Sequence, residues 1–198
     1  MLRVVLTGSI ATGKSTVLAR FREHSIPTYS ADEAVHALYA GEAAALVETL
    51  FPGTVKDGEV DRKALSAAIA SEPGRIGELE EVIHPLVREK AHEFFDAVQA
   101  EGRALAVIEI PLFYETGTQY RAGKVVVTHC DPDIQRQRVL ARPGMSEQKL
   151  DLILSRQLTQ EEKRAKADYA IDTSGTMDDT LARTDTVIAA LKALAEAR

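Results

Sequence analysis

The stretch that decides the fold is "LTGSIATGKST", residues 6–16. It follows the apolar run 2–6, which predicts a buried strand, and it leads into residues 14–24, whose apolar spacing predicts a helix. Gly8 and Gly13 bracket four residues and are followed by Lys14 and Ser15. This strand, glycine loop and helix together are typical of a phosphate-binding loop.

Each residue type in the loop has a chemical reason. Glycines permit backbone angles that side chains forbid, so successive N–H groups can point inward at phosphate oxygens. The positive end of the following helix adds to this attraction, the lysine bridges the outer phosphates, and the serine hydroxyl helps to bind Mg²⁺. A plain glycine turn between strand and helix is the alternative. The residues expected to line the phosphate site are Gly8, Ala11, Thr12, Gly13, Lys14, Ser15 and Thr16.

Strands and helices alternate along the chain, which favours a parallel sheet covered by helices on both faces. Further strands are expected at 26–29, 104–110, 124–128 and 167–172. We therefore expect an α/β fold, the three-layer α/β/α P-loop NTPase fold with a five-stranded parallel sheet, all within one domain over 1–198. Residues 42–101 look helical and form an insertion, with a loop at 51–60. Pro85 should break or kink this helical stretch and push His84 towards an extended conformation.

Composition narrows the function. Apolar residues make up 45% and charged residues 27%, as in ordinary globular proteins, and the net charge of -6 argues against nucleic acid as a partner. The single cysteine, Cys130, permits no internal disulfide and is expected to be a buried structural thiol, which fits a reducing compartment. There is no signal-peptide pattern and no run of about 18 apolar residues, so we expect a cytoplasmic protein with no membrane partner.

A basic segment follows at 136–166, where eight Lys or Arg residues and four acids leave a local charge of +4. Next to a phosphate loop, such a segment is typical of a helical lid that closes over a triphosphate and excludes water. A solvated helix face is the alternative. The candidate lid cations are Arg138, Arg142, Arg156, Lys163 and Arg164.

Two acids stand at strand ends. Asp32 could act as the base of a phosphoryl transfer, or it could cap the helix that begins there. Glu109 could hold Mg²⁺ in its second sphere, or it could face solvent. A guanine-nucleotide switch is disfavoured, because the chain has no asparagine and so lacks the usual Asn-Lys-x-Asp motif.

Several ordered pieces resemble one family. They are "LTGSIATGKST", "SADEA", "VIHPLVRE", "IPLFYE", "RVLARPGMSE", "SRQLTQEEKRAKADYAID" and "TSG". Along essentially its whole length the chain resembles dephospho-coenzyme A kinase. The resemblance implies ATP-dependent phosphorylation of the ribose 3′-hydroxyl of dephospho-CoA, with Mg²⁺, an inserted helical domain for the CoA moiety, and a lid. ATP and dephospho-CoA would be its partners, and the protein a monomer or small homo-oligomer.

The resemblance also carries roles onto residues of this chain. It implies that Asp32 is the base, and that Arg138 and Arg142 of the lid assist Lys14 in stabilising the transferred group. The residues that would contact the acceptor are His84, Pro85, Arg88, Pro111, Leu112 and Glu115. His84 could instead be a packed or capping histidine. Ser15 and Glu109 would serve the metal.

The chain departs from the family pattern at a few positions. Ser30 replaces the first acid of Asp-Ala-Asp, Glu109 replaces an aspartate, and Thr173 replaces the asparagine of "IDNSG". The loop is also leaner in glycine, and His129-Cys130 precede Pro132 in place of the usual residues. The Thr173 change could loosen adenine contacts. Two rival functions stay open, a kinase of a nucleoside monophosphate or sugar and a non-catalytic nucleotide-binding regulator.

Overall fold

The computed structural model describes residues 1–117 and 122–197. The chain forms two compact units, one made of Met1–Tyr29 with Phe95–Arg198 and the other of Ser30–Phe94. The second unit thus begins and ends earlier than the predicted insertion 42–101. Each unit has a hydrophobic core of its own.

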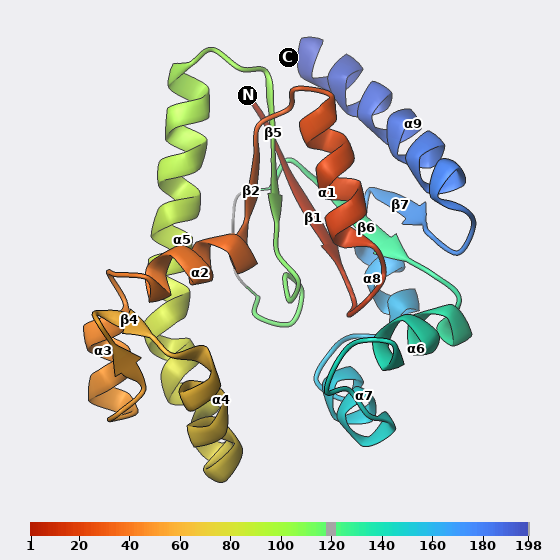
Figure 1. Ribbon diagram of the computed structural model, residues 1–198. Helices are drawn as coiled ribbons and strands as arrows, with labels where there is room; N and C mark the ends of the chain where they lie inside the picture. The colour runs from red at the N-terminus through yellow and green to blue at the C-terminus, as the bar shows by residue number, and fades with distance from the viewer. Residues whose placement is uncertain (118–121, 198) are drawn as a thin grey trace. The chain divides into compact units, whose positions relative to one another are not determined.

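The first unit is built on a five-stranded sheet in the order β2-β5-β1-β6-β7 (Figure 1). Its strands are β1 (Leu2–Gly8), β2 (Thr28–Ser30), β5 (Leu105–Glu109), β6 (Lys124–His129) and β7 (Tyr169–Asp172). β1 pairs in parallel with both β5 and β6, and β6 pairs in parallel with β7. The predicted parallel sheet is therefore confirmed, and its first strand lies in the middle.

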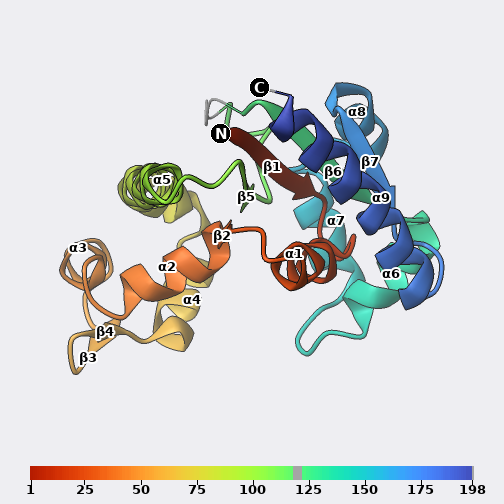
Figure 2. The same cartoon turned by 90° about the horizontal axis from the view of Figure 1, so that it is seen from above.

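Helices cover both faces of this sheet. α1 (Lys14–Glu23) and α9 (Met177–Glu196) lie against one face, and α8 (Gln160–Lys166) lies on the other (Figures 1 and 2). Val4 and Leu6 of β1 pack with Phe21 of α1 and Leu191 of α9, and all four side chains are almost fully buried. Burying such side chains is the main force that fixes the helices on the sheet.

Each of the three helices in and just before the segment 136–166 begins at a side-chain cap. α6 (Pro132–Leu140) is capped by Asp131, α7 (Glu147–Leu154) by Ser146, and α8 by Thr159. Thr159 and Glu162 form a reciprocal capping box, which satisfies two backbone N–H groups at once. Local side-chain chemistry therefore sets these boundaries.

The second unit is mostly helical. It contains α2 (Ala31–Tyr39), α3 (Ala44–Leu50), α4 (Arg62–Ser71), a short 3₁₀ turn (Pro73–Arg75) and most of α5 (Ile76–Ala100). The prediction of a loop at 51–60 was incomplete, because this segment contains a hairpin of β3 (Val55–Lys56) and β4 (Glu59–Val60). Asp57 and Gly58 at its tip have φ of 51° and 83°, as the twist of a two-residue hairpin turn requires.

Pro85 does not end its helix. α5 runs without a break from Ile76 to Ala100 with Pro85 inside it, so the prediction of an extended His84 was wrong. Pro85 lies on the exposed face. The backbone carbonyl left without its N–H partner there can be hydrated, which lowers the cost of proline within a helix.

Candidate phosphate-binding site

The glycine loop follows β1 at the carboxyl edge of the sheet, between strands reached by crossovers in opposite directions, where α/β proteins bind ligands. Ala11 and Gly13 have φ of 59° and 83°. A Cβ atom added to Gly8 would lie only 2.3 Å from the Thr128 hydroxyl oxygen. Position 8 therefore admits glycine alone, and the left-handed residues turn main-chain N–H groups into the loop.

The loop leads directly into the first turn of α1. The Lys14 ammonium donates to the carbonyl oxygens of Gly8 and Ser9 at 2.9 and 3.0 Å, so its charge lies across the loop. Ser15 is exposed and Thr16 is half-buried. No side chain caps the helix, because its N-cap residue is Gly13. The N–H groups of a helix N-terminus and the helix dipole favour an anion.

The side chain of Thr12 lies beneath the loop. It is fully buried, donates to the Ser9 carbonyl oxygen at 2.9 Å, and lies 2.8 Å from the Thr128 hydroxyl oxygen. The side chain therefore braces the loop from beneath.

Three glutamines, which sequence reasoning missed, hold the tip of the loop. The Ile10 N–H donates to Gln157 Oε1 at 3.2 Å, and the Ile10 carbonyl oxygen accepts from Gln135 Nε2 at 2.8 Å. Gln160 then donates to Gln135 at 3.0 Å. Glutamines of α6 and of the segment 136–166 thereby bind both the N–H and the carbonyl group of Ile10.

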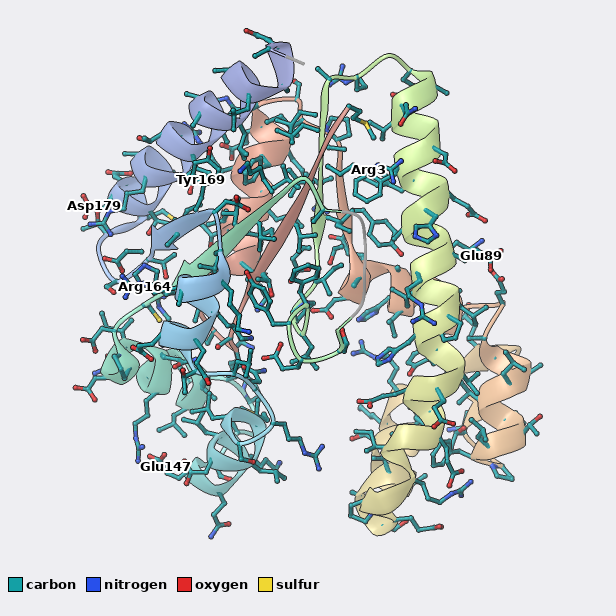
Figure 3. The ribbon with its side chains drawn as sticks, turned by 180° about the vertical axis from the view of Figure 1, so that it is seen from behind. Arg3, Glu89, Glu147, Arg164, Tyr169 and Asp179 are labelled. Carbon is teal, nitrogen blue, oxygen red and sulfur yellow. The ribbon has the colours of Figure 1, made fainter. Side chains whose placement is uncertain are left out.

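The predicted lid cations fall into three groups. Arg142, Arg156 and Arg164 are exposed, and among the described residues their guanidinium groups form no hydrogen bond or ion pair (Figure 3 labels Arg164 on α8). Arg138 donates to both oxygens of Thr173. Lys163 is fully buried. Three of the five candidates are thus exposed and able to meet an anion.

Lys163 forms a buried ion pair. Its ammonium lies 2.8 Å from Glu115 Oε1, and the Leu158 N–H donates to the same oxygen at 2.9 Å. Glu115 is predicted to line an acceptor cleft, but the structure engages its carboxylate with α8. The pair joins the turn after β5 to the basic segment.

For each of Glu109 and Asp32, the structure excludes one of the two roles that the sequence left open. Glu109 is only 6% exposed at the end of β5, beside Leu6 of β1, so the solvent-facing alternative is wrong. Asp32 is exposed in the first turn of α2, and Ser30 Oγ accepts from the Glu33 N–H as the cap. The capping alternative for Asp32 is therefore wrong as well. Its carboxylate has no hydrogen bond or ion pair among the described residues.

The acceptor-side residues are divided between the units. His84 and Arg88 lie one helical turn apart on the exposed face of α5, with Pro85 beside them, in the second unit. Pro111 and Leu112 are half-buried in the turn after β5, in the first unit, where the Thr7 hydroxyl donates to the Pro111 carbonyl oxygen at 3.3 Å. Within the first unit, Glu109 lies beside Leu6 of β1, and Arg138 reaches the loop through Thr173.

Burial shifts the pKa of three titratable groups in the first unit. It raises the pKa of the Cys130 thiol, which supports the predicted structural role, since a protonated thiol is a poor nucleophile. Burial, with Arg164 nearby, lowers the pKa of His129, so the imidazole is neutral near pH 7. Burial and then the Asp168 carboxylate raise the pKa of Tyr114 to about 12.

Two features of the described residues concern metals and membranes. Nowhere in 1–117 and 122–197 do three or more His, Cys, Asp or Glu side chains gather in a way that could hold a metal ion. In the same ranges no helix combines the length and hydropathy needed to span a bilayer.

The sheet, the glycine loop at the tip of its middle strand and the exposed arginines define a P-loop kinase. The chain matches the family model described as dephospho-CoA kinase over residues 2–179, and it belongs to that family. A dephospho-CoA kinase of Brucella melitensis is 50% identical over 179 residues, which are 90% of each chain.

Two solved structures share the fold of this chain. The structure of TT1252 from Thermus thermophilus is similar with a TM-score of 0.79 and 31% identity, covering 96% of both chains. A dephospho-CoA kinase from Campylobacter jejuni is similar with a TM-score of 0.70 and 27% identity, again covering 96% of both chains.

Proposed function

We propose that this protein transfers the γ-phosphoryl group of ATP to the ribose 3′-hydroxyl of dephospho-CoA, which yields coenzyme A. The observation that carries the proposal is the loop itself, whose backbone is shaped for a polyphosphate in a chain of this family. Phosphoryl transfer depends mainly on positioning and on stabilising charge, so the roles of the residues follow from their chemistry.

The loop and Lys14 hold the triphosphate. Main-chain N–H groups of residues 8–15 would donate to the β- and γ-phosphate oxygens, and the N-terminus of α1 would add its positive end. The Lys14 ammonium already lies across the loop, within hydrogen-bond distance of Gly8 and Ser9. It would offset negative charge as the group is transferred.

Mg²⁺ would be held by few protein groups. The exposed hydroxyl of Ser15 and the buried carboxylate of Glu109 supply the hard oxygen atoms that Mg²⁺ prefers, and such sites usually complete their ligands with phosphate and water. When bound, Mg²⁺ would neutralise charge on the β- and γ-phosphates. Both residues therefore fit this ion.

Asp32 is the proposed base. Its carboxylate is exposed and does not cap α2, so it can accept a proton from the attacking hydroxyl or orient that hydroxyl. His84, Pro85 and Arg88, which share an exposed stretch of α5, are proposed to bind the acceptor, and the same role is proposed for Pro111 and Leu112. Arg142 and Arg138 would stabilise the transferred group, and closure of 136–166 would exclude water.

A substrate panel tests the proposal. Purified protein is incubated with ATP and Mg²⁺ and with dephospho-CoA, a nucleoside monophosphate or a hexose, while ADP release is followed. Fast ADP release with dephospho-CoA alone supports the proposal. Transfer to the monophosphate or the sugar alone supports the rival kinase, and ATP binding without ADP release in any arm supports a regulator. The oligomeric state, predicted to be monomer or small homo-oligomer, can be measured on the same sample.

A further inference from the structure

Thr173 lies directly beneath the phosphate loop. It follows β7, it is only 2% exposed, and its N–H donates to the His129 carbonyl oxygen at 2.8 Å, which continues the sheet. A Cβ atom added to Gly13 would come within 3.2 Å of the Thr173 methyl carbon. The side chain of Thr173 is therefore packed against the last turn of the loop.

The hydroxyl of Thr173 holds one peptide of that loop. Its Oγ1 lies 3.1 Å from the Thr12 carbonyl oxygen and 3.3 Å from the His129 carbonyl oxygen, to which it can donate one proton. Peptide groups are planar, and the described residues contain no cis peptide bond. Holding the Thr12 carbonyl towards Thr173 therefore turns the Gly13 N–H the opposite way.

The same residue holds a lid arginine. Arg138 Nη1 donates to Thr173 Oγ1 at 3.1 Å, and Nη2 donates to the Thr173 carbonyl oxygen at 2.7 Å. Among the described residues no carboxylate pairs with Arg138, so its charge is not neutralised there. A guanidinium has five N–H donors, and three stay available for an anion.

We propose that Thr173 is a positioning residue for phosphoryl transfer, because it orients the Gly13 N–H and the Arg138 guanidinium from one buried point. Arg138 must donate to the hydroxyl, which leaves the hydroxyl proton for an acceptor, and the Thr12 carbonyl oxygen at 3.1 Å is nearer than that of His129 at 3.3 Å. With the proton on the Thr12 side, Arg138, Thr173 and the Thr12–Gly13 peptide form one chain of hydrogen bonds. This inference rests on the proposed function, since it assigns a task within that reaction.

The test compares Thr173→Val, which keeps the shape and removes the hydroxyl, with Thr173→Ser, which keeps the hydroxyl. We expect Thr173→Val to lower kcat about tenfold and to raise the Kd for ATP several-fold, with KM for dephospho-CoA within about twofold. Thr173→Ser should restore kcat to within about twofold of the wild type. All assays are run well below the Tm of each variant, so that loss of folded protein does not contribute.

A second arm uses Arg138→Ala. If Thr173 acts through Arg138, adding Thr173→Val to this variant should lower kcat by clearly less than in the wild type. A Thr173→Val variant with a lower Tm but unchanged kcat and ATP affinity would overturn the inference, and so would equal losses in both backgrounds. If the wild type itself transfers no phosphate, the proposed function fails instead.

Discussion

The Lys14 ammonium donates to the Gly8 carbonyl oxygen at 2.9 Å, which joins the first residue of α1 to the last residue of β1. The lysine side chain thus spans the loop and places its positive charge beside the loop backbone. One residue supplies both the local geometry and the charge that a transferred phosphoryl group needs.

Replacing Lys14 should lower the rate of phosphoryl transfer without lowering the stability of the fold. Lys14→Met keeps the length of the side chain and removes its charge, so we expect kcat to fall about 100-fold or more. Steady-state ADP release measures this. Because Lys14 is partly exposed, the Tm should stay within a few degrees of the wild type. A variant that keeps most of its turnover would show that the charge is not used.

Asp32→Asn should abolish the proposed base without disturbing the helix. We expect kcat to fall by a factor of about 10²–10⁴, while the Kd for ATP changes less than about threefold. Glu33→Gln, one residue further along the exposed start of α2, is the matched control and should keep kcat within about twofold. Equal activity of the two variants would remove Asp32 from the mechanism.

The lid arginines can be tested on a pair of exposed residues. Arg142 has no partner for its guanidinium among the described residues, whereas Arg136 is paired with Glu147 at 2.8 Å (Figure 3 labels Glu147 on α7). We expect Arg142→Ala to lower kcat/KM for ATP by about 10–100-fold. Arg136→Ala should change it by less than about twofold, and a similar loss in both would indicate a general charge effect.

The Lys163–Glu115 ion pair should matter for stability. Lys163→Met leaves the Glu115 carboxylate buried without its cation, which typically costs about 3–5 kcal/mol in the free energy of unfolding. Urea denaturation measures it. The double variant Lys163→Met with Glu115→Gln should recover part of the loss, and the exposed Lys166→Met should cost under about 0.5 kcal/mol. No recovery in the double variant would contradict the pairing.

Asp185 should give the fold a dependence on acid pH. Its carboxylate accepts from Arg20 and lies 2.8 Å from His24 Nε2, and the hydrogen bond with Arg20 is the main reason that its pKa falls to about 2. A pKa lowered on folding stabilises the protein above the unfolded value of about 4, and this contribution is lost as the pH falls towards 2.

Asp185→Asn should therefore melt lower than the wild type at pH 7, by about 2 °C for so exposed a pair. The difference should shrink through pH 4 and vanish near pH 2. Calorimetry at several pH values measures it, with Asp151→Asn on exposed α7 as the control. A difference in Tm that persists unchanged at pH 2 would refute the electrostatic origin.

Local signals in the sequence were enough for the strands of the sheet and for the glycine loop, because each depends on residues close together in the chain. These local signals did not predict contacts between residues far apart in the chain. Gln157 meets Ile10 across 147 positions, and Arg138 meets Thr173 across 35, at strand and helix ends whose approach only the folded sheet defines. At Pro85 the local rule itself gave a wrong prediction, because a proline on the exposed face of a helix does not end it here.

The central claim is direct transfer from the loop-bound triphosphate to a ribose 3′-oxygen. The most direct measurement uses ATP whose γ-phosphoryl group carries ¹⁸O at its non-bridging positions, with Mg²⁺, dephospho-CoA and the purified protein. We predict that tandem mass spectrometry will find the product with its labelled phosphoryl group on the 3′-oxygen. A labelled group at any other position, or labelled inorganic phosphate as the only product, would contradict the account.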